Sequence, residues 1–402
     1  MSAPIPIGGL VPLTGPSAAD GAEFRNGVVL AVEELNAEGG ILGRPLEPVF
    51  VDTCRQTADE VVSATRRLIE RHRVHAIING YNIGSQNAEY EPIADAGIVY
   101  IHHNTLLQHH DTVMSDPERY FGCFQGDPAD YWYGQGLIKF ISWLRDSGQW
   151  RPESNRIAIV SGSKPYSIVI ANAMASAARQ FGWQVAYGPR VTVTPRTEWR
   201  EVIEEVRAVD PAVVANTHFY PGDLAHFHRQ FMERPMNCLL YLQYGAMHQT
   251  FVEMVQEEAV GVIVGTVIGL LRDEIGQAFA QRYLARFGEA STPQVGCQSY
   301  TATRHYALAA AQAGGTAGPG GHAQNRRVAR HLTRTIYRGV VGAVHYHPEW
   351  QSAIPYPNWT ADPSLGMPHL FYQIQDHLKE QVLIAPEPYN TGRFALPPWV
   401  GE

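Results

Sequence analysis

The sequence is poor in three features that mark common protein classes: cysteine, long apolar runs and clustered positive charge. Its four cysteines are widely spaced over 402 residues and form no Cys-x-x-Cys pair, which argues against a structural zinc site. No apolar stretch approaches the roughly 18 residues of a membrane span, so we expect only peripheral contact with a membrane. The net charge is -8 and no basic run occurs, so nucleic acid is not an expected partner.

The cysteines leave two interpretations open. An even number permits two disulfides in three alternative pairings, whereas the same residues also suit the role of small buried hydrophobes. The residues concerned are Cys54, Cys123, Cys238 and Cys297.

No catalytic or cofactor motif is complete in the sequence. There is no phosphate-binding P-loop, no dinucleotide-binding glycine fingerprint and no nucleophile elbow. The stretch 161–164 matches the Ser-x-x-Lys pattern of serine acylases, but the partner motifs Ser-Asp-Asn and Lys-Thr-Gly are missing. Adjacent histidines such as His102 and His103 point to opposite faces of a strand rather than toward one metal. The sequence therefore predicts no enzyme, no cofactor and no metal site.

What the sequence does contain is a repeated unit of apolar strand, short polar turn and amphipathic helix. Thr57 and Glu60 form a capping box that opens one of these helices. Asp127 and Pro128 predict the start of another, running to about residue 147, and Ser85 to Ala96 reads as a third. This alternation predicts an α/β fold with parallel sheets and right-handed crossovers, divided between two lobes.

Ligands of open α/β sheets bind beyond the carboxyl ends of the strands, so the turns there hold the candidate site residues. These turns carry hydroxyl, amide, imidazole and aromatic groups, which suit a small polar organic molecule. The candidates are Asp20, Tyr81, Asn82, Gly84, Ser85, His102, His103, Asn104, Tyr166, His218, Phe219, Tyr220 and Tyr244.

Four segments in the first hundred residues resemble the Leu/Ile/Val-binding type of solute-binding proteins, also called type I periplasmic binding proteins. Ile7 to Pro16 resembles the opening strand and loop of that family, and Ala31 to Arg44 resembles its first helix and the Gly-Gly-Ile turn that follows. The stretches 51–58 and 85–98 are similar to the next two units. The tail segments 386–389 and 396–399 also look like members of this family.

The resemblance implies two Rossmann-like lobes joined by a three-strand hinge, with a ligand trapped between them by hinge closure. By this analogy the N-terminal lobe comprises residues 1–123 and 267–345, and the C-terminal lobe comprises residues 124–266 and 346–402. The implied partners are the small-molecule ligand and the membrane subunits of an ABC importer. The sequence starts without a cationic segment followed by an apolar run. We therefore expect a periplasmic protein read from its mature start, with a cytoplasmic location as the alternative.

The family's binding positions fall on the candidates named above. The loop after the first strand presents an aromatic side chain to ligand in the family, and Asp20 stands at that position here. Residues 81–85 and 102–105 match the loops that bind the ligand carboxylate, and Tyr166 and Phe219 or Tyr220 match second-lobe tyrosines. The family's disulfide from Cys54 would need a cysteine near Asn82, where there is none.

An acidic residue that pairs with the ligand ammonium is expected near Tyr244, and no acid is there. A buried ammonium without a carboxylate partner is costly. Either Asp20 supplies that carboxylate, or the ligand is an amide, a urea or an aromatic acid rather than an ordinary amino acid. In the second case the imidazoles of His102, His103 and His218 could donate to a carboxylate or stack on a ring.

The predicted function is thus an extracytoplasmic solute-binding protein of an ABC importer. Two alternatives stay open: a cytoplasmic amide- or amino-acid-sensing regulator on the same fold and, with less support, an amidohydrolase. The hydrolase would need a nucleophile beside a base, and the sequence offers no convincing pair.

Overall fold

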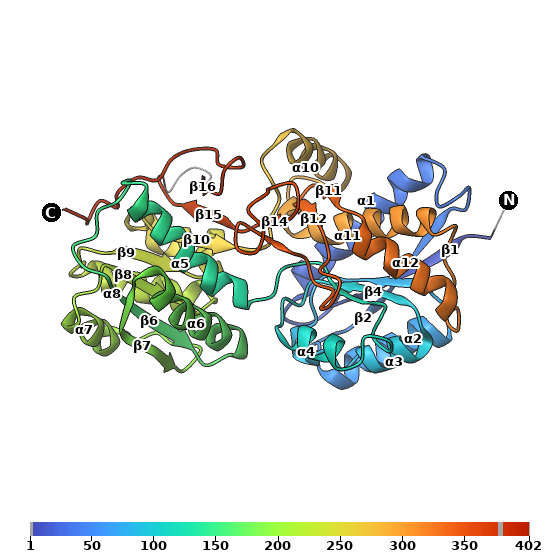
Figure 1. Ribbon diagram of the computed structural model, residues 1–402, viewed down its shortest axis with the longest axis horizontal. Coiled ribbons are helices and arrows are strands. Elements are labelled where there is room, and N and C mark those ends of the chain that lie inside the picture. The colour runs from blue at the N-terminus through green and yellow to red at the C-terminus, as the bar shows by residue number, and fades with distance from the viewer. Residues whose placement is uncertain (1–2, 377–380, 402) are drawn as a thin grey trace. The chain divides into compact units, whose positions relative to one another are not determined.

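The chain folds into two compact units and crosses from one to the other three times (Figure 1). The structure is a computed structural model that describes residues 3–376 and 381–401. Unit 1 comprises Met1–Ala129 and Ile268–Pro368, and unit 2 comprises Asp130–Val267 and His369–Glu402. The stretch 346–368, which the family analogy assigns to the C-terminal lobe, is therefore part of unit 1.

Unit 1 is built on a parallel sheet of five strands in the order β2-β1-β3-β4-β5. Its strands are β1 (Ile5–Val11), β2 (Leu46–Asp52), β3 (Ala76–Ile78), β4 (Val99–His102) and β5 (Cys123–Gln125). Because the strands are parallel, all their carboxyl ends lie along one edge of the sheet. The polar turns that follow β1, β3 and β4 therefore gather at that edge.

Helices cover both faces of this sheet, as Figure 1 shows. The helices of unit 1 are α1 (Ala18–Ala37), α2 (Ala58–Glu70), α3 (Tyr90–Ala96), α4 (Gln108–Ser115), α10 (Glu274–Phe287), α11 (Pro293–Gln312) and α12 (His322–Arg334), with a 3-10 turn, η1, at Ile83–Ser85. One core packs α1, α10, α11 and α12 against the sheet, and a second packs α2, α3 and α4 against its other face. Both faces of the strands are buried, which explains their nearly continuous apolar sequences.

Four short strands complete unit 1: β11 (Tyr337–Gly339), β12 (Gly342–Val344), β13 (Pro355–Tyr356) and β14 (Met367–Pro368). Between β12 and β13 the chain extends the main sheet beyond β5. The Gln125 amide donates to the Gln351 carbonyl at 3.0 Å, and the Ala353 amide donates to the Gln125 carbonyl at 3.1 Å. Tyr346, Ala353 and Met367 lie in the same core as α11. These contacts place residues 346–368 in unit 1.

Unit 2 contains a seven-stranded sheet in the order β16-β15-β10-β9-β8-β6-β7. Its strands are β6 (Arg156–Gly162), β7 (Gln184–Thr192), β8 (Val213–Asn216), β9 (Leu239–Leu242), β10 (Ile263–Thr266), β15 (Leu370–Gln373) and β16 (Val382–Ala385). The strands from β6 to β10 pair in parallel, whereas β15 and β16 add in antiparallel fashion. The two strands expected near residues 369–374 and 381–385 are thus confirmed as β15 and β16.

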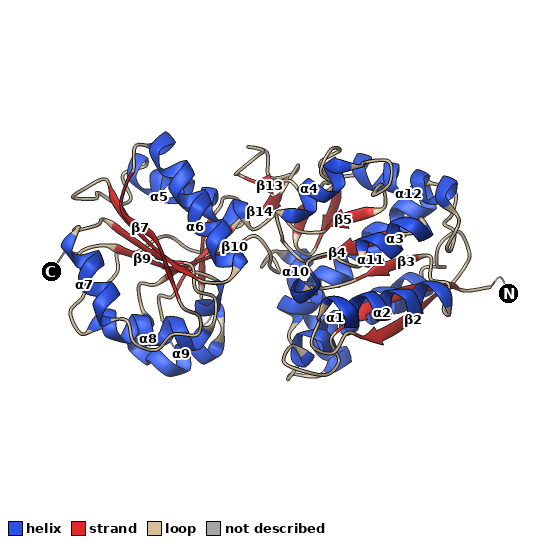
Figure 2. Ribbon diagram, turned by 90° about the horizontal axis from the view of Figure 1, so that it is seen from below, coloured by secondary structure: helices blue, strands red, loops and turns tan. Residues whose placement is uncertain are grey.

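The sheet of unit 2 also lies between helices. These are α5 (Tyr131–Asp146), α6 (Pro165–Ala178), α7 (Arg200–Ala208), α8 (Pro221–Met232) and α9 (Gln249–Val255), with 3-10 turns η2 (Arg179–Phe181), η3 (Tyr244–Met247) and η4 (Gln256–Ala259). Figure 2 shows α5 and α6 on one side of the sheet and α7, α8 and α9 on the other. The α/β class predicted from the alternating pattern is confirmed in both units.

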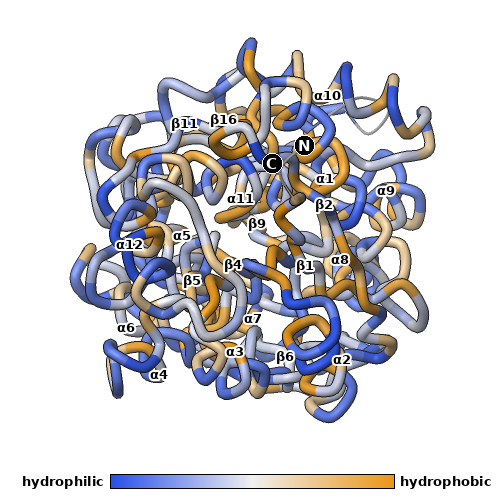
Figure 3. Tube along the Cα trace, turned by 90° about the vertical axis from the view of Figure 1, so that its right-hand side faces the viewer, coloured by the Kyte–Doolittle hydropathy of each residue, from blue (hydrophilic) through white to orange (hydrophobic). Residues whose placement is uncertain are grey.

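Each helix turns one apolar face inward, and this sets its hydropathy pattern. Along α10, blue and orange segments alternate in Figure 3, and the residues that point into the core are Gly276, Phe279 and Tyr283. This spacing of three and four residues is that of an amphipathic helix. Within the described residues, no helix combines the length and the apolar character needed to cross a bilayer.

The capping box predicted at Thr57 is confirmed. The Thr57 hydroxyl accepts from the Glu60 amide, and the Glu60 carboxylate accepts from the Thr57 amide at 3.1 Å. The two side chains thereby satisfy backbone donors that the first turn of α2 leaves free.

Two predicted helix starts are wrong. The helix expected from Ser85 begins only at Tyr90, because Gln86 and Asn87 adopt positive φ angles of 49° and 63° that a helix cannot include. The helix expected to follow Asp127 begins at Tyr131, and it is Asp130 whose carboxylate accepts from the Tyr131 amide at 2.8 Å.

All four cysteines are free thiols, and three of them are fully buried. Burial raises the pKa of the Cys123, Cys238 and Cys297 thiols. Of the two interpretations left open by the sequence, the structure has the small buried hydrophobe. The half-buried Cys54 has no disulfide partner either.

Candidate functional site

The carboxyl edge of the unit 1 sheet presents an acid and a phenol that touch. Asp20 lies in the first turn of α1, Tyr81 follows β3, and the Tyr81 hydroxyl donates to the Asp20 carboxylate. The Tyr81 ring meets Phe24 edge-on, with ring centroids 5.1 Å apart. Both Asp20 and Tyr81 are half-buried. Their contact therefore forms a polar patch that a ligand can reach.

The loop after β3 is tied to the loop after β4 by an amide pair. The Asn82 backbone amide donates to Asn104 Oδ1 at 2.6 Å, and Asn82 Nδ2 donates to the Leu10 carbonyl at 3.1 Å. Thr53 adds a donor to Asn82 Oδ1 at 2.9 Å. Asn82 and Asn104 are both fully buried. They act as cross-links between strand ends, and the backbone around them forms the exposed surface.

Gly84 is the exposed residue of this loop, and its lack of a side chain is needed. A Cβ atom at this position would lie 2.5 Å from the Gln56 carbonyl oxygen. Gln56 in turn donates through Nε2 to the Tyr81 carbonyl at 3.2 Å. The loops after β2 and β3 therefore pack backbone against backbone, which only glycine permits.

A buried carboxyl group lies directly beneath this loop. Glu89 precedes α3, and its Oε2 lies 2.7 Å from Ser85 Oγ while its Oε1 accepts from Tyr100 at 2.8 Å. Burial raises the pKa of the Glu89 carboxyl. Sequence reasoning missed this residue. The available signal was its position four residues before Ile93, on the face by which α3 packs on the sheet.

His102 is a buried member of a polar cluster rather than an exposed donor. Its Nε2 contacts the Tyr90 hydroxyl, which also reaches His109 Nδ1 at 2.6 Å. Its Nδ1 accepts from the Asn104 amide at 3.1 Å. Burial, with the neighbouring imidazoles, holds the pKa of His102 well below its ordinary range. A neutral ring with both nitrogens engaged fixes the position of Asn104.

His103 points away from His102, as expected for adjacent strand residues. Its Nδ1 lies 2.7 Å from the Asn79 carbonyl, and its Nε2 lies 3.9 Å from Asp127 Oδ1. Burial lowers the pKa of His103 to about 4 and raises the pKa of Asp127 well above its usual range. The Asp127 carboxyl, the expected helix cap, has no hydrogen-bond partner within the described residues.

The carboxyl edge of the unit 2 sheet is rich in aromatic rings. Tyr166 lies at the start of α6, and its ring meets those of Tyr133 and Phe219 edge-on at 5.8 Å and 5.5 Å. Its hydroxyl accepts from Gln243 Nε2 at 3.0 Å, and Gln243 Oε1 accepts from Tyr241. Gln243 is thus a buried amide directly behind Tyr166, in the turn where the family analogy expects an acid.

His218 is enclosed in unit 2 by two neighbours. Its Nδ1 lies 2.9 Å from Asp223 Oδ2, and its Nε2 lies 2.7 Å from Thr192 Oγ1. Burial lowers the pKa of His218 against the opposing pull of Asp223. The pair joins the loop after β8 to α8 and to the end of β7. It therefore holds Phe219 and Tyr220 in place, and Tyr220 itself is 41% exposed.

Tyr244 opens the 3-10 turn η3, and it is half-buried. Its ring meets His248 edge-on at 5.1 Å. The candidates of each unit thus fall into two groups. Asp20, Tyr81, Gly84, Tyr166, Phe219, Tyr220 and Tyr244 are partly or fully exposed, whereas Asn82, Ser85, His102, His103, Asn104 and His218 are buried and bonded within their own unit.

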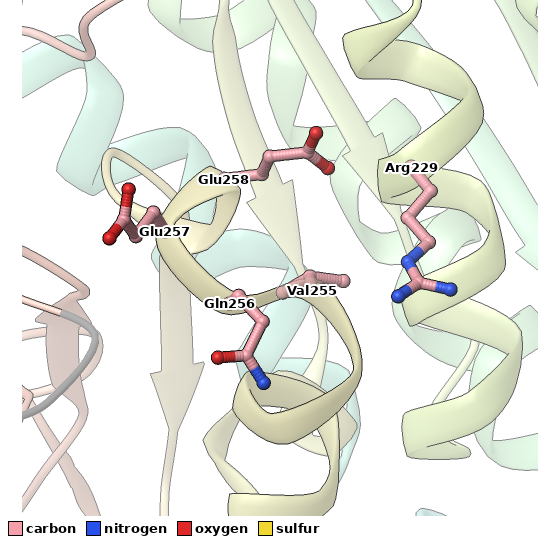
Figure 4. A pocket seen from close by; sticks show the side chains of 5 residues that line it. All are labelled: Arg229, Val255, Gln256, Glu257 and Glu258. Atoms are coloured by element: carbon pink, nitrogen blue, oxygen red, sulfur yellow. The ribbon is translucent and has the colours of Figure 1, made fainter.

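The hollows that the surface of unit 2 displays lie elsewhere. One is a shallow depression of about 340 Å³ lined by Arg229 and residues 255–258. Figure 4 shows Glu258 pointing toward the helix that carries Arg229, whereas Glu257 points away. This depression lies on the helical layer, not at the strand ends. Within residues 3–376 and 381–401, no group of three or more metal-ligating side chains is assembled.

Two parallel-sheet units that exchange the chain three times, with aromatic and amide groups at their strand ends, define a two-unit α/β binding protein. Residues 4–354 match the family model described as "Periplasmic binding protein". The chain belongs to the periplasmic binding protein family, in its type I, Leu/Ile/Val-binding branch, which confirms the resemblance noted in the sequence. This is a family of solute-binding proteins rather than enzymes.

Individual relatives agree with this assignment. A crystal structure from Silicibacter pomeroyi, provisionally assigned as a branched-chain amino acid ABC transporter, is 45% identical, covers 99% of this chain and 100% of its own, and gives a TM-score of 0.97. The substrate-binding protein LivJ from Streptococcus pneumoniae, solved with isoleucine, shares the fold at 18% identity, with coverage of 94% and 99% and a TM-score of 0.68.

A curated relative from Brucella abortus, "Leu/Ile/Val-binding protein homolog 7", is 34% identical over 99 residues. That match spans 25% of this chain and 24% of the relative, so it covers only about a quarter of the relative's length.

Proposed function

We propose that this protein is an extracytoplasmic solute-binding protein of an ABC importer, which captures a small polar organic ligand between its two units. The observation that carries this proposal is the near full-length similarity to the Silicibacter pomeroyi protein at 45% identity. Its partners are then the membrane subunits of the importer, and its location is the periplasm. The ligand is held by hinge closure and released chemically unchanged.

The exposed candidates of unit 1 supply one half of this ligand site. The Asp20 carboxylate accepts from Tyr81, and no other hydrogen bond involves it within the described residues. It keeps lone pairs free for a donor on the ligand, such as an ammonium or amide nitrogen. The exposed backbone at Gly84 offers the family's route to a ligand carboxylate, through a main-chain N–H group.

The exposed candidates of unit 2 supply the other half. Tyr166, Phe219, Tyr220 and Tyr244 present ring faces and hydroxyl groups, with the Gln243 amide behind Tyr166. Rings enclose the apolar body of a ligand, and a few dipoles orient its ends. The absence of an acid in the turn 243–245 favours a ligand whose nitrogen is met by Asp20 of unit 1, or one that carries no positive charge.

The ligand class is tested by a thermal-shift screen over four groups: branched-chain and other amino acids, short amides, ureas and aromatic acids. A compound that binds only the folded protein raises the melting temperature by an amount that grows with its concentration. We expect a hit among the amino acids or amides, and mass spectrometry of the released compound should return it unaltered. No shift with any group, or a chemically changed compound, would overturn the proposal.

A further inference from the structure

We propose that Glu89 is a positioning residue whose carboxyl group carries a proton at Oε2 and, through Ser85, fixes the loop 82–85. The contact of this loop with ligand rests on the proposed function, whereas the proton on Glu89 does not. Nothing in the sequence pattern or in the resemblance assigns a role to this residue.

The first observation is a count of protons around Ser85. Its hydroxyl oxygen lies 2.8 Å from the Asn82 carbonyl oxygen and 2.7 Å from Glu89 Oε2. A serine hydroxyl has one proton to donate. If Glu89 were ionised, one of these two short contacts would join two lone pairs. A proton on Oε2 removes the conflict, because Glu89 then donates to Ser85 and Ser85 donates to Asn82.

The second observation is the set of groups that surround Glu89. Its other oxygen accepts from the Tyr100 hydroxyl at 2.8 Å, and the Asn104 side chain also interacts with the carboxyl. The titratable groups that face it are Tyr90 and Glu91 on its own helix, Tyr100 on β4 and Cys123 on β5. None of these is a cation. An ionised carboxylate at this fully buried position would therefore have no counter-charge.

The third observation is what this chain of bonds connects. Glu89 bonds Ser85, Ser85 bonds Asn82, and the Asn82 amide bonds Asn104 at 2.6 Å. Asn82 also donates to Leu10 of β1. One protonated carboxyl group thus links α3 to the carboxyl ends of β1 and β4. Ionising it breaks one link at Ser85, and the exposed backbone at Gly84 then loses its fixed position.

Substitution by glutamine mimics the protonated acid. In Glu89→Gln the amide nitrogen donates to Ser85 and the amide oxygen accepts from Tyr100, so the whole chain of bonds is kept without a titrating proton. In Glu89→Leu the volume is similar, but both bonds are lost and Ser85 and Tyr100 lose a buried partner. The two variants therefore separate the hydrogen-bonding role from simple packing.

The test begins without any ligand. The infrared spectrum of the full chain at neutral pH should show a protonated-carboxyl band that Glu89→Gln removes. Hydrogen exchange of the segment 81–88, corrected for the intrinsic effect of pH, should be equally slow in wild type and Glu89→Gln and faster in Glu89→Leu. In alkali the wild type should lose this protection and Glu89→Gln should keep it. Loss of protection in Glu89→Gln at neutral pH, or an unchanged infrared band, would overturn the proposal.

Isoleucine serves as the probe for the ligand step. We expect Glu89→Gln to keep the wild-type affinity within about twofold, and Glu89→Leu to lose at least about tenfold, since a buried hydrogen-bond network is broken. A loss of affinity in Glu89→Gln as large as that in Glu89→Leu would contradict the role in positioning. If isoleucine does not bind the wild type, the ligand class of the proposed function fails for that compound, and the infrared and exchange results still decide on Glu89.

Discussion

At the scale of single residues, the Asp20 carboxylate differs from the other acids near the strand ends. Glu89 and Asp127 are buried, and Asp52 accepts from Thr14 and from backbone amides. Asp20 is half-buried and accepts only from Tyr81 within the described residues. It is thus the acid of unit 1 best placed to meet a positively charged ligand nitrogen.

This geometry predicts the effect of Asp20→Asn. If the ligand carries an ammonium group, its binding should weaken by about 2–5 kcal/mol, because the charge loses its partner. Binding of an uncharged amide should change little. Calorimetry with isoleucine and with acetamide measures both effects. Asp59→Asn, an exposed acid on α2 of the same unit, is the matched control. Equal isoleucine affinities of wild type and Asp20→Asn would exclude Asp20 as the ammonium partner.

The sequence located the turns of the candidate site, but not the burial of their side chains. The parallel alternation placed His102, His103 and His218 at the carboxyl ends of strands, and they are there. Whether an imidazole faces solvent depends on neighbours far away in sequence, such as Thr192 for His218. A local pattern cannot supply such contacts.

At the scale of secondary-structure elements, α1 and α11 approach each other closely through glycine. A Cβ atom on Gly27 would lie 2.2 Å from the Gly296 carbonyl oxygen and 2.3 Å from Ser299 Oγ. The Ser299 hydroxyl also donates to the Phe24 carbonyl at 2.8 Å. The two helices therefore meet backbone to backbone, and this contact fixes how α11 lies on the sheet that carries Asp20.

Gly27→Ala should therefore destabilise the protein by at least about 1–3 kcal/mol, the usual cost of forcing an extra carbon into a packed contact. Gly222→Ala on α8 is the control, because nothing lies within 4 Å of the added atom. That variant should be neutral or slightly stabilising. Urea denaturation of both variants measures the free energy of unfolding. A Gly27→Ala protein as stable as Gly222→Ala would show that the helices can separate without cost.

Local signals determined some elements fully and others not at all. Thr57 and Glu60 lie three residues apart and specify a helix start by themselves. The late start of α3 depends on Gln86 and Asn87, which take a left-handed conformation that the sequence does not announce. The place of residues 346–368 depends on pairing with Gln125, more than two hundred residues earlier. Long-range pairing of this kind leaves no periodic signal.

At the scale of the whole molecule, both units bury neutral imidazoles. In unit 1, burial lowers the pKa of His109 to about 3, of His110 to about 4 and of His305 to about 3. In unit 2, burial lowers the pKa of His228 to about 4 and of His369 to about 3. In the unfolded chain these groups titrate near the ordinary value of 6.5.

Stability should consequently fall in acid. Below pH 6.5 the unfolded chain takes up protons that the folded protein refuses until pH 4 to 3, so the free energy of unfolding decreases over that interval. Each such histidine contributes up to about 1.4 kcal/mol per pH unit. His305 stacks between Tyr337 and Tyr346, so His305→Phe keeps the stacking. It should lower the slope by one histidine's share in urea denaturation across this range. Parallel curves for the two proteins would refute this account.

The threefold crossing of the chain also governs the order in which the protein can be completed during synthesis. The strands β1 to β5 are made first, but α10, α11 and α12, which cover one face of their sheet, are encoded after residue 267. The sheet of unit 2 likewise acquires β15 and β16 only from the last tenth of the sequence. A nascent chain therefore bears an uncovered apolar face until translation is nearly finished. It stays loosely folded for that time, which is the state that passage through a membrane pore requires.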